Sequence, residues 1–151
     1  MSTVPTSDYK FSEQIGHLLR RAYQRHTAIF QEVVPDSQLT AAQFVVLCAV
    51  RDAGPCEIGR IVQATAIDES SVRGIVERLK WRHLLAVEHA PGDTRRMSIS
   101  LTQMGADLIE QTVPFALQIS ERTFGELDTS ERAAIVGLLR KISGIDRNTD
   151  G

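Results

Sequence analysis

The chain has 151 residues, and its 17 Lys and Arg against 19 Asp and Glu give a formal net charge of -2. Its 42% hydrophobic and 24% charged residues fit one globular domain with a sizeable core, and they argue against a disordered chain, a disulfide scaffold or a long fibre. No apolar run approaches the roughly 18 to 20 residues that span a bilayer, so we expect no membrane-spanning segment. A net charge near zero gives no general attraction to nucleic acid, so any DNA-binding function has to rest on local charge placement.

The N-terminal segment and the cysteines bear on the cellular compartment. Residues 1–8 are polar and lack the basic start and apolar stretch of a secretory signal, so we expect a cytoplasmic protein. The two cysteines, Cys48 and Cys56, are too few for a disulfide framework in a domain of this size. We expect both thiols to be reduced and mostly buried.

The first expected helix runs from about residue 9 to residue 33, and Pro35 ends it. Its apolar residues recur at spacings of three, four or seven, namely Phe11, Ile15, Leu18, Ala22, Ile29 and Val33. Arg25 interrupts this face, so we expect the face to meet a polar neighbour as well as a core.

A central helix is expected next. Thr40 and Gln43 form a capping box at its start, and Gly54 followed by Pro55 ends it. The positions between them are apolar around most of the helix, as is typical of a buried central helix. A short helix is expected to follow at residues 57–65.

Asp68 is a favourable N-cap for the next helix. Its inward positions are Val72, Ile75, Val76 and Leu79. The same spacing turns five other residues outward, namely Ser70, Arg73, Gly74, Glu77 and Trp81. We expect Trp81 to pack against its neighbours at the end of this helix.

After Leu84 the apolar residues alternate, which predicts a two-stranded hairpin. Its loop is expected over residues 90–96, where Pro91, Gly92 and Asp93 supply the turn. Three polar residues are then left at the tip or just beyond it, namely Thr94, Arg95 and Arg96.

Two more helices complete the pattern. Thr102 is expected to cap the first, and Pro114 lies well inside it, so we expect a kink near Glu110. The last helix is expected to start at Asp128 or Thr129.

The order of these elements predicts a fold that is mainly α-helical with a small β-hairpin wing. We expect residues 36–102 to form a winged helix-turn-helix lobe, and residues 9–33 and 103–146 to form a helical dimerisation lobe, within a single domain over residues 1–151. Two such lobes on a two-fold axis would read half-sites about 34 Å apart on double-stranded DNA.

The outward face of the Asp68 helix is the expected DNA contact. Ser70 and Ser71 lie in its first turn, where hydroxyls and free amides suit phosphate oxygens, and Arg73 is long enough to reach a guanine edge. A glycine such as Gly74 lowers helix stability by about 1 kcal/mol relative to alanine in a helix interior. Its presence here is explained either by a close approach of the backbone to DNA or by a tolerated surface position. Glu77 can either accept from a cytosine amino group or pair with an arginine of the wing, and we expect the pairing because phosphate repels a nearby acid.

At the wing, Asp93 and Arg95 are two residues apart, so the carboxylate can orient the guanidinium. A fixed arginine suits the negative potential of a narrow minor groove. We therefore expect Thr94, Arg95 and Arg96 to contact DNA, with a solvated hairpin tip as the open alternative.

These residues make the sequence resemble the MarR family of transcriptional regulators. The most specific stretches are Asp68–Val72, Ile75–Leu79, Leu84–Leu85 and Asp93–Thr102, with Gly105 close behind. The resemblance covers nearly the whole chain. It implies a homodimer that binds an inverted-repeat operator, usually as a repressor, and that a small aromatic or phenolic effector often releases.

Four positions depart from the family pattern. Where the family usually has a hydroxyl residue and then an arginine, this chain has Arg73 and then Gly74, and His83 and Ala90 replace a common glycine and a common acid. Asp93 and Arg95 match the pattern of the wing.

The resemblance also implies an effector site between the two lobes. Phe11, His17, Arg20 and Phe44 are our candidate residues, since they offer aromatic walls and a cation or imidazole for a carboxylate. The expected ligand is an aromatic acid such as a hydroxybenzoate or hydroxynicotinate. Three alternatives stay open: that Phe44 packs in the core, that Arg20 lies on a solvated face and that His17 is an interface residue.

The cysteines offer a different kind of regulation, by oxidants. Some relatives sense oxidants through a thiol near the N-terminus, whereas this chain has no cysteine before Cys48. Cys56, beside a helix start, is the candidate for such a role.

The four histidines have no close metal spacing, and no phosphate loop or catalytic triad stands out, so we expect no enzyme, no metal and no cofactor. A winged helix for protein contacts would need an apolar outward face, which Trp81 alone offers.

Overall fold

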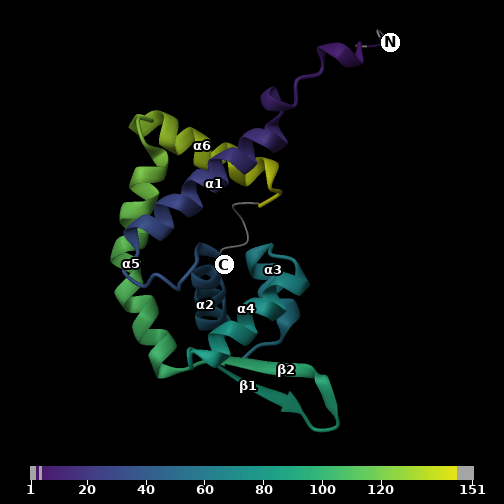
Figure 1. Ribbon diagram of the computed structural model, residues 1–151, viewed down its shortest axis with the longest axis vertical. Coiled ribbons are helices and arrows are strands. Elements are labelled where there is room, and N and C mark those ends of the chain that lie inside the picture. The colour runs from purple at the N-terminus through teal and green to yellow at the C-terminus, as the bar shows by residue number, and fades with distance from the viewer. Residues whose placement is uncertain (1–2, 4, 146–151) are drawn as a thin grey trace.

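The computed structural model describes residue 3 and residues 5–145 of the protein (Figure 1). Its elements, in chain order, are the 3-10 helices η1 (Thr6–Asp8) and η2 (Phe11–Glu13), helices α1 (Ile15–Val33), α2 (Ala41–Ala53), α3 (Ile58–Thr65) and α4 (Glu69–Trp81), strands β1 (Leu85–Ala90) and β2 (Asp93–Leu101), and helices α5 (Gln103–Phe124) and α6 (Thr129–Ile142). The mainly α-helical fold with a small hairpin wing is confirmed. Residue 146, the expected end of the dimerisation segment, lies outside the described residues.

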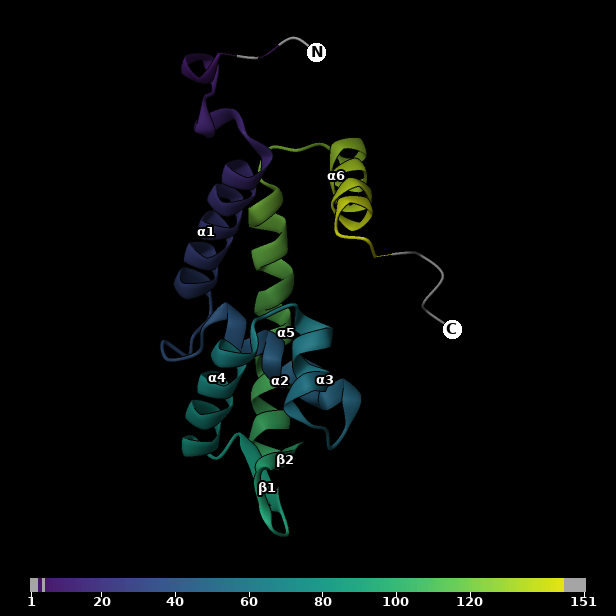
Figure 2. The ribbon, with the colours of Figure 1, turned by 90° about the vertical axis from the view of Figure 1, so that its right-hand side faces the viewer.

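The molecule has two lobes joined by one long helix. Helices α2, α3 and α4 with the hairpin form one lobe, and α1 and α6 lie at the other end (Figures 1 and 2). Helix α5 begins beside the hairpin, runs along α2 and then packs against α1. This helix therefore connects the hairpin mechanically to the far lobe.

Helix α1 begins later than the sequence predicts. It starts at Ile15, and the residues from Tyr9 to Gln14 form instead a 3-10 turn flanked by extended residues. The amide of Gln14 donates to the carbonyl oxygen of Phe11 over 3.1 Å, and its side chain donates to the carbonyl oxygen of Lys10 over 3.2 Å. The apolar spacing continues through this turn. Periodicity does not distinguish a 3-10 turn from the first turn of an α-helix, which is why the sequence predicts an earlier start of the helix.

The three predicted caps, at Thr40, Asp68 and Thr102, are confirmed, and α6 starts at Thr129, one of the two predicted positions. Thr40 and Gln43 exchange both hydrogen bonds of a capping box at the start of α2, and Asp128 caps α6 in the same way. The side chain of Asp68 accepts from the amide of Ser71, and that of Thr102 accepts from the amide of Gly105. Each cap satisfies amides that a helix leaves without partners in its first turn.

Helix α2 lies at the centre of the core. It contributes Val46, Leu47 and Val50, which are fully buried, as the sequence predicts for a central helix. Fully buried side chains from the neighbouring elements pack around it, among them Leu39, Ile61, Val72, Leu79 and Ile99. None of the helices in the described part of the chain is long and apolar enough to cross a bilayer.

The hairpin has a tighter turn than the sequence predicts. Strand β2 already begins at Asp93, which pairs with Ala90, so the turn is only Pro91 and Gly92, with Gly92 at a φ of +78°. The strand register shifts between His89 and Ala90. Thr94, Arg95 and Arg96, which were expected in the loop, therefore lie in β2 at this irregularity.

The hairpin is fixed to the rest of its lobe at two places. Cys56, just before α3, exchanges two backbone hydrogen bonds with Ile99, of 2.9 and 2.8 Å. At the start of α5, a Cβ on Gly105 would lie 2.2 Å from the carbonyl oxygen of Leu84, so only glycine permits this close packing. The wing is thereby held against both the start of α3 and the start of α5.

Helix α5 is continuous from Gln103 to Phe124 although it contains Pro114. The helix bows along its length in Figure 1. Curvature of this kind is what the missing amide of an internal proline produces.

Candidate nucleic-acid interface

The outward face of α4 has the composition predicted for it. Val72, Val76 and Leu79 are buried and fix the rotation of the helix. All five residues expected outward are exposed, namely Ser70, Arg73, Gly74, Glu77 and Trp81. The face therefore presents hydroxyl, guanidinium and carboxylate groups to solvent.

The start of α4 carries a fixed negative charge. Asp68 accepts from the amide of Ser71 over 3.0 Å and from its hydroxyl over 2.7 Å. These two hydrogen bonds from Ser71 hold the pKa of the Asp68 carboxyl below its usual value. The amide and the hydroxyl proton of Ser71 are thus already engaged.

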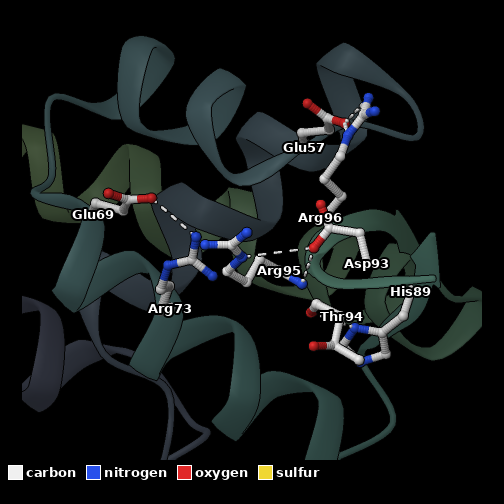
Figure 3. Close-up of polar contacts among 8 residues, drawn as sticks. All are labelled: Glu57, Glu69, Arg73, His89, Asp93, Thr94, Arg95 and Arg96. Carbon is white, nitrogen blue, oxygen red and sulfur yellow. Dashed lines mark hydrogen bonds and ion pairs between the residues drawn. The ribbon is translucent and has the colours of Figure 1, made fainter. Parts of the chain in front are cut away.

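Arg73 is exposed but held within its own helix. Its Nη2 donates to Glu69 Oε1 over 3.0 Å, across one turn of α4 (Figure 3). At Gly74, a Cβ would meet no protein atom within 4 Å, so packing in the protomer does not explain this glycine.

Two expectations about this face are wrong. Among residues 3 and 5–145 no ion pair involves Glu77, and the wing arginines pair instead with Asp93 and Glu57. Trp81 does not pack against its neighbours: it is 77% exposed, because it ends α4 on the outward side.

In the wing, Asp93 lies beside Arg95. Its Oδ1 accepts from the amide of Arg95 over 3.0 Å and lies 3.7 Å from the guanidinium Nε (Figure 3). The Arg95 side chain is 92% exposed, so the guanidinium projects from the wing. His89 Nδ1 lies 3.0 Å from the carbonyl oxygen of Thr94 and connects the two strands near the tip.

Arg96 is turned toward the helix-turn-helix. Its Nε and Nη2 donate to Glu57 Oε1 over 3.2 and 3.0 Å, where Glu57 is the N-cap residue of α3 (Figure 3). The two residues are 39 positions apart, and neither residue type nor local spacing signals their contact. Glu57 is a residue that the sequence analysis missed.

The structure does not bring the four candidate effector residues together. Exposed Phe11 meets half-buried His17 edge to face, with ring centroids 5.1 Å apart. Phe44 is half-buried, with its ring 6.0 Å from that of buried Phe30, while Arg20 is exposed on α1. A groove of about 520 Å³ between the lobes has other walls, namely Val34, Pro35, Asp36, Leu108, Gln111, Thr112 and Phe115.

The far lobe is held together by polar contacts between α1 and α5. Arg25 donates to the carbonyl oxygens of Thr123 and Arg122, over 2.7 and 2.8 Å, at the C-terminal end of α5. This is the polar neighbour that its place on the apolar face predicts, since the last carbonyl groups of a helix attract cations. Next to it, His26 Nδ1 lies 2.9 Å from the hydroxyl of Thr123.

The same lobe leaves large apolar side chains in solvent. Helix α6 buries none of its residues, and Leu138 and Ile142 are each 61% exposed. On α1 and α5, Ile15 is 63% and Leu117 is 70% exposed. Exposed apolar surface on this scale is typical of an interaction surface.

The two thiols lie in environments that suppress their reactivity. Burial raises the pKa of Cys48 and of Cys56, and the charge of Arg60 only partly offsets this at Cys56. The raised pKa argues against Cys56 in the oxidant-sensing role for which it was the candidate. Within the described part of the chain, no cluster of three His, Cys, Asp or Glu side chains could hold a metal ion.

The chain is similar along most of its length to known regulators. It is 52% identical over 140 residues to the HTH-type transcriptional repressor NicR of Pseudomonas putida, covering 93% of this chain and 89% of that protein. It is 29% identical over 143 residues to the multiple antibiotic resistance protein MarR of Escherichia coli, covering 91% and 96%. No known protein-family profile matches the chain.

The chain belongs to the MarR family.

Two solved structures agree with its fold. One is BpsR of Bordetella bronchiseptica, whose DNA binding is regulated by 6-hydroxynicotinic acid; it has 61% sequence identity and a TM-score of 0.85, over 90% of this chain and 98% of that one. The other is a mutant of Escherichia coli MarR in complex with operator DNA, with 25% identity and a TM-score of 0.77, over 89% and 99%. This MarR-family chain is a transcriptional regulator, in which α3 and α4 form the helix-turn-helix and β1 and β2 form the wing.

Proposed function

We propose that this MarR-family regulator acts in the cytoplasm as a homodimeric repressor, with no catalytic step of its own. It binds an inverted-repeat operator and leaves it when a small aromatic acid binds. The observation that carries the proposal is the similarity over nearly the whole chain to NicR, a repressor, and to BpsR, whose DNA binding responds to 6-hydroxynicotinic acid. We therefore propose 6-hydroxynicotinic acid as the effector.

DNA recognition is assigned to two surfaces of each protomer. Helix α4 enters the major groove with Ser70, Ser71, Arg73 and Gly74, and Arg73 reads a base edge. The wing places Thr94, Arg95 and Arg96 along the neighbouring backbone and minor groove, with Asp93 orienting Arg95. The 92% exposure of Arg95 supports this assignment, since a projecting guanidinium can enter a narrow groove.

Dimerisation is assigned to the lobe that contains α1, α6 and the second half of α5. The exposed apolar side chains of α6 support it, because a helix with a complete capping box and no buried residue lacks a packing partner within its own protomer. A second copy of the chain supplies that partner. The two recognition helices are then related by a two-fold axis, as an inverted repeat requires.

Effector binding is assigned to Phe11, His17, Arg20 and Phe44. Because Phe44 lies apart from the Phe11–His17 pair within one protomer, a single site needs residues of both protomers. The Phe11–His17 pair offers an aromatic wall, and Arg20 offers a guanidinium for the carboxylate of the acid. An effector can act only if it binds more tightly to the dimer whose recognition helices are wrongly spaced for the operator.

The proposal is tested by titrating 6-hydroxynicotinic acid into the protein by calorimetry and into the protein–operator complex by fluorescence anisotropy. We expect binding by the free protein and release of the operator, with nicotinic acid, which lacks the hydroxyl, as the control ligand. Arg20→Gln should lose the response while operator binding persists, and Arg21→Gln, at the exposed neighbouring position, should keep it. A complex that is insensitive to 6-hydroxynicotinic acid would overturn the choice of effector.

A further inference from the structure

The arginines of the DNA-facing surface are each paired with an acid of the same chain. Arg73 pairs with Glu69, Arg95 lies beside Asp93, and Arg96 pairs with Glu57, as Figure 3 shows. The positive charges that should attract phosphate are therefore largely compensated before DNA arrives. The formal net charge of -2 adds no general attraction of its own.

Two of these pairs have hydrogen-bond geometry. The guanidinium of Arg73 lies 3.0 Å from Glu69 Oε1, with side chains that are 43% and 63% exposed. The guanidinium of Arg96 lies 3.0 Å from Glu57 Oε1, with side chains that are 67% and 60% exposed. All four groups thus face solvent, and a phosphate oxygen could take the place of either carboxylate.

We propose that Glu69 and Glu57 compete with DNA phosphates for Arg73 and Arg96, and thereby hold down the affinity of the protein for DNA of any sequence. The inference rests on the DNA-binding surface assigned above. Each arginine must leave its carboxylate before it can neutralise a phosphate. The same carboxylates, when left without their partner, also repel the DNA backbone.

The size of the competition follows from the exposure of the pairs. Exposed ion pairs are weak, so each one should lower affinity by only about two- to fivefold. A competition of this size is easily overcome at an operator, where a guanine offers Arg73 two hydrogen bonds in place of one carboxylate. On random DNA no such gain is available, and the pairs limit binding.

The test compares Glu69→Gln and Glu57→Gln with the wild-type protein on non-operator DNA over a salt titration. Because a dimer carries each pair twice, we expect each variant to bind about four- to 25-fold more tightly. We also expect the plot of log K against log salt to steepen by about one for each arginine freed, hence by about two for a dimer. Both acids are exposed, so circular dichroism should show an unchanged fold.

Two controls separate release of an arginine from the loss of a negative charge. Glu77→Gln removes the same charge from the same exposed face of α4, where no ion pair involves Glu77 among the described residues, and it should leave the salt slope unchanged. Glu69→Gln should also lose its effect in an Arg73→Gln background, and Glu57→Gln in an Arg96→Gln background.

The outcomes distinguish the inference from the function on which it rests. If Glu69→Gln and Glu57→Gln only match Glu77→Gln, or if their effects persist without the arginines, the competition does not exist. If the wild-type protein binds no DNA even at low salt, the DNA-binding function fails and the inference with it.

Discussion

Asp36 and Arg82 form an ion pair that joins the segment between α1 and α2 to the end of α4. The Nη2 of Arg82, the C-cap residue of α4, lies 2.5 Å from Asp36 Oδ2, although the residues are 46 positions apart. Asp36 also accepts from the amide of Gln38 over 3.0 Å, and both side chains are less than one-third exposed, at 23% and 30%. Because Asp36 lines the groove between the lobes, this pair connects that groove to α4.

Removing the carboxylate should destabilise the protein in a pH-dependent way. Burial opposes ionisation of Asp36, but the hydrogen bonds from Arg82 and Gln38 and the charge of Arg82 outweigh it and lower the pKa of this carboxyl. A lowered pKa in the folded state gives stability that is present above the unfolded-state pKa of about 3.9 and is lost as pH falls through the folded value. Asp36→Asn should therefore cost about 1 to 3 kcal/mol at pH 7 and much less at strongly acid pH, measured by urea unfolding.

Asp52 supplies the matched control for this prediction. It pairs with Arg51 over 2.9 Å at a position where its side chain is 68% exposed. Asp52→Asn should change stability by less than about 1 kcal/mol at pH 7. A penalty for Asp36→Asn that stays constant with pH would contradict the account of this pair.

Arg95→Ala should weaken operator binding by about 1 to 3 kcal/mol and leave the dimer intact, because we assign the projecting guanidinium to DNA and it lies in the wing, outside the proposed dimer lobe. Fluorescence anisotropy measures the affinity, and light scattering measures the mass of the protein. Arg21→Ala, an exposed arginine of α1, should have little effect on either. Unchanged operator affinity in Arg95→Ala would remove the wing from the mechanism.

Arg73→Ala should change the base preferred at one position in each half-site. The reason is that a guanidinium at a base edge distinguishes guanine, whereas a guanidinium at a phosphate does not. Binding of a set of operators with single base changes measures this preference. Equal weakening on every sequence would show that Arg73 contacts only phosphate.

Leu138→Glu should convert the dimer to a monomer and abolish operator binding. Its side chain is 61% exposed on α6 in the protomer, and burying a carboxylate in an apolar interface is costly. Size-exclusion chromatography with light scattering gives the mass. Ser130→Glu introduces the same charge in the first turn of α6 and should stay dimeric; a dimeric Leu138→Glu would place the interface elsewhere.

Operator binding should resist mild oxidation by peroxide at neutral pH. Burial raises the pKa of Cys56 and of Cys48, so both thiols stay protonated near pH 7, and the protonated thiol is the unreactive form. Anisotropy before and after peroxide treatment measures the response. Loss of binding that Cys56→Ser prevents would revive the redox-sensing alternative.

Local interactions made much of this fold predictable from the sequence. The caps at Thr40, Asp68 and Thr102 each depend on a hydrogen bond to an amide three residues along the chain, so the local sequence suffices to find them. The periodicity of Val72, Val76 and Leu79 likewise predicts that Arg73 lies on the outward face of α4.

Contacts between distant segments were beyond the sequence. The packing of distant segments brings together Glu57 with Arg96 and Asp36 with Arg82. No spacing in the sequence predicts these two contacts. The turn of the wing was missed for a related reason: an irregular register placed three residues in a strand that the sequence pattern assigned to a loop. Exposure of Trp81 was missed because an apolar side chain at a helix end carries no sign of whether a partner covers it.

The most direct test of the account is selection of bound sequences from a random DNA library with purified protein, in the absence and presence of 6-hydroxynicotinic acid. We predict enrichment of an inverted repeat with half-sites about one helical turn apart, and its loss when the acid is added. Absence of any enriched sequence would contradict the central claim that this MarR-family protein is an operator-binding regulator. An inverted repeat that survives the acid would contradict the effector alone.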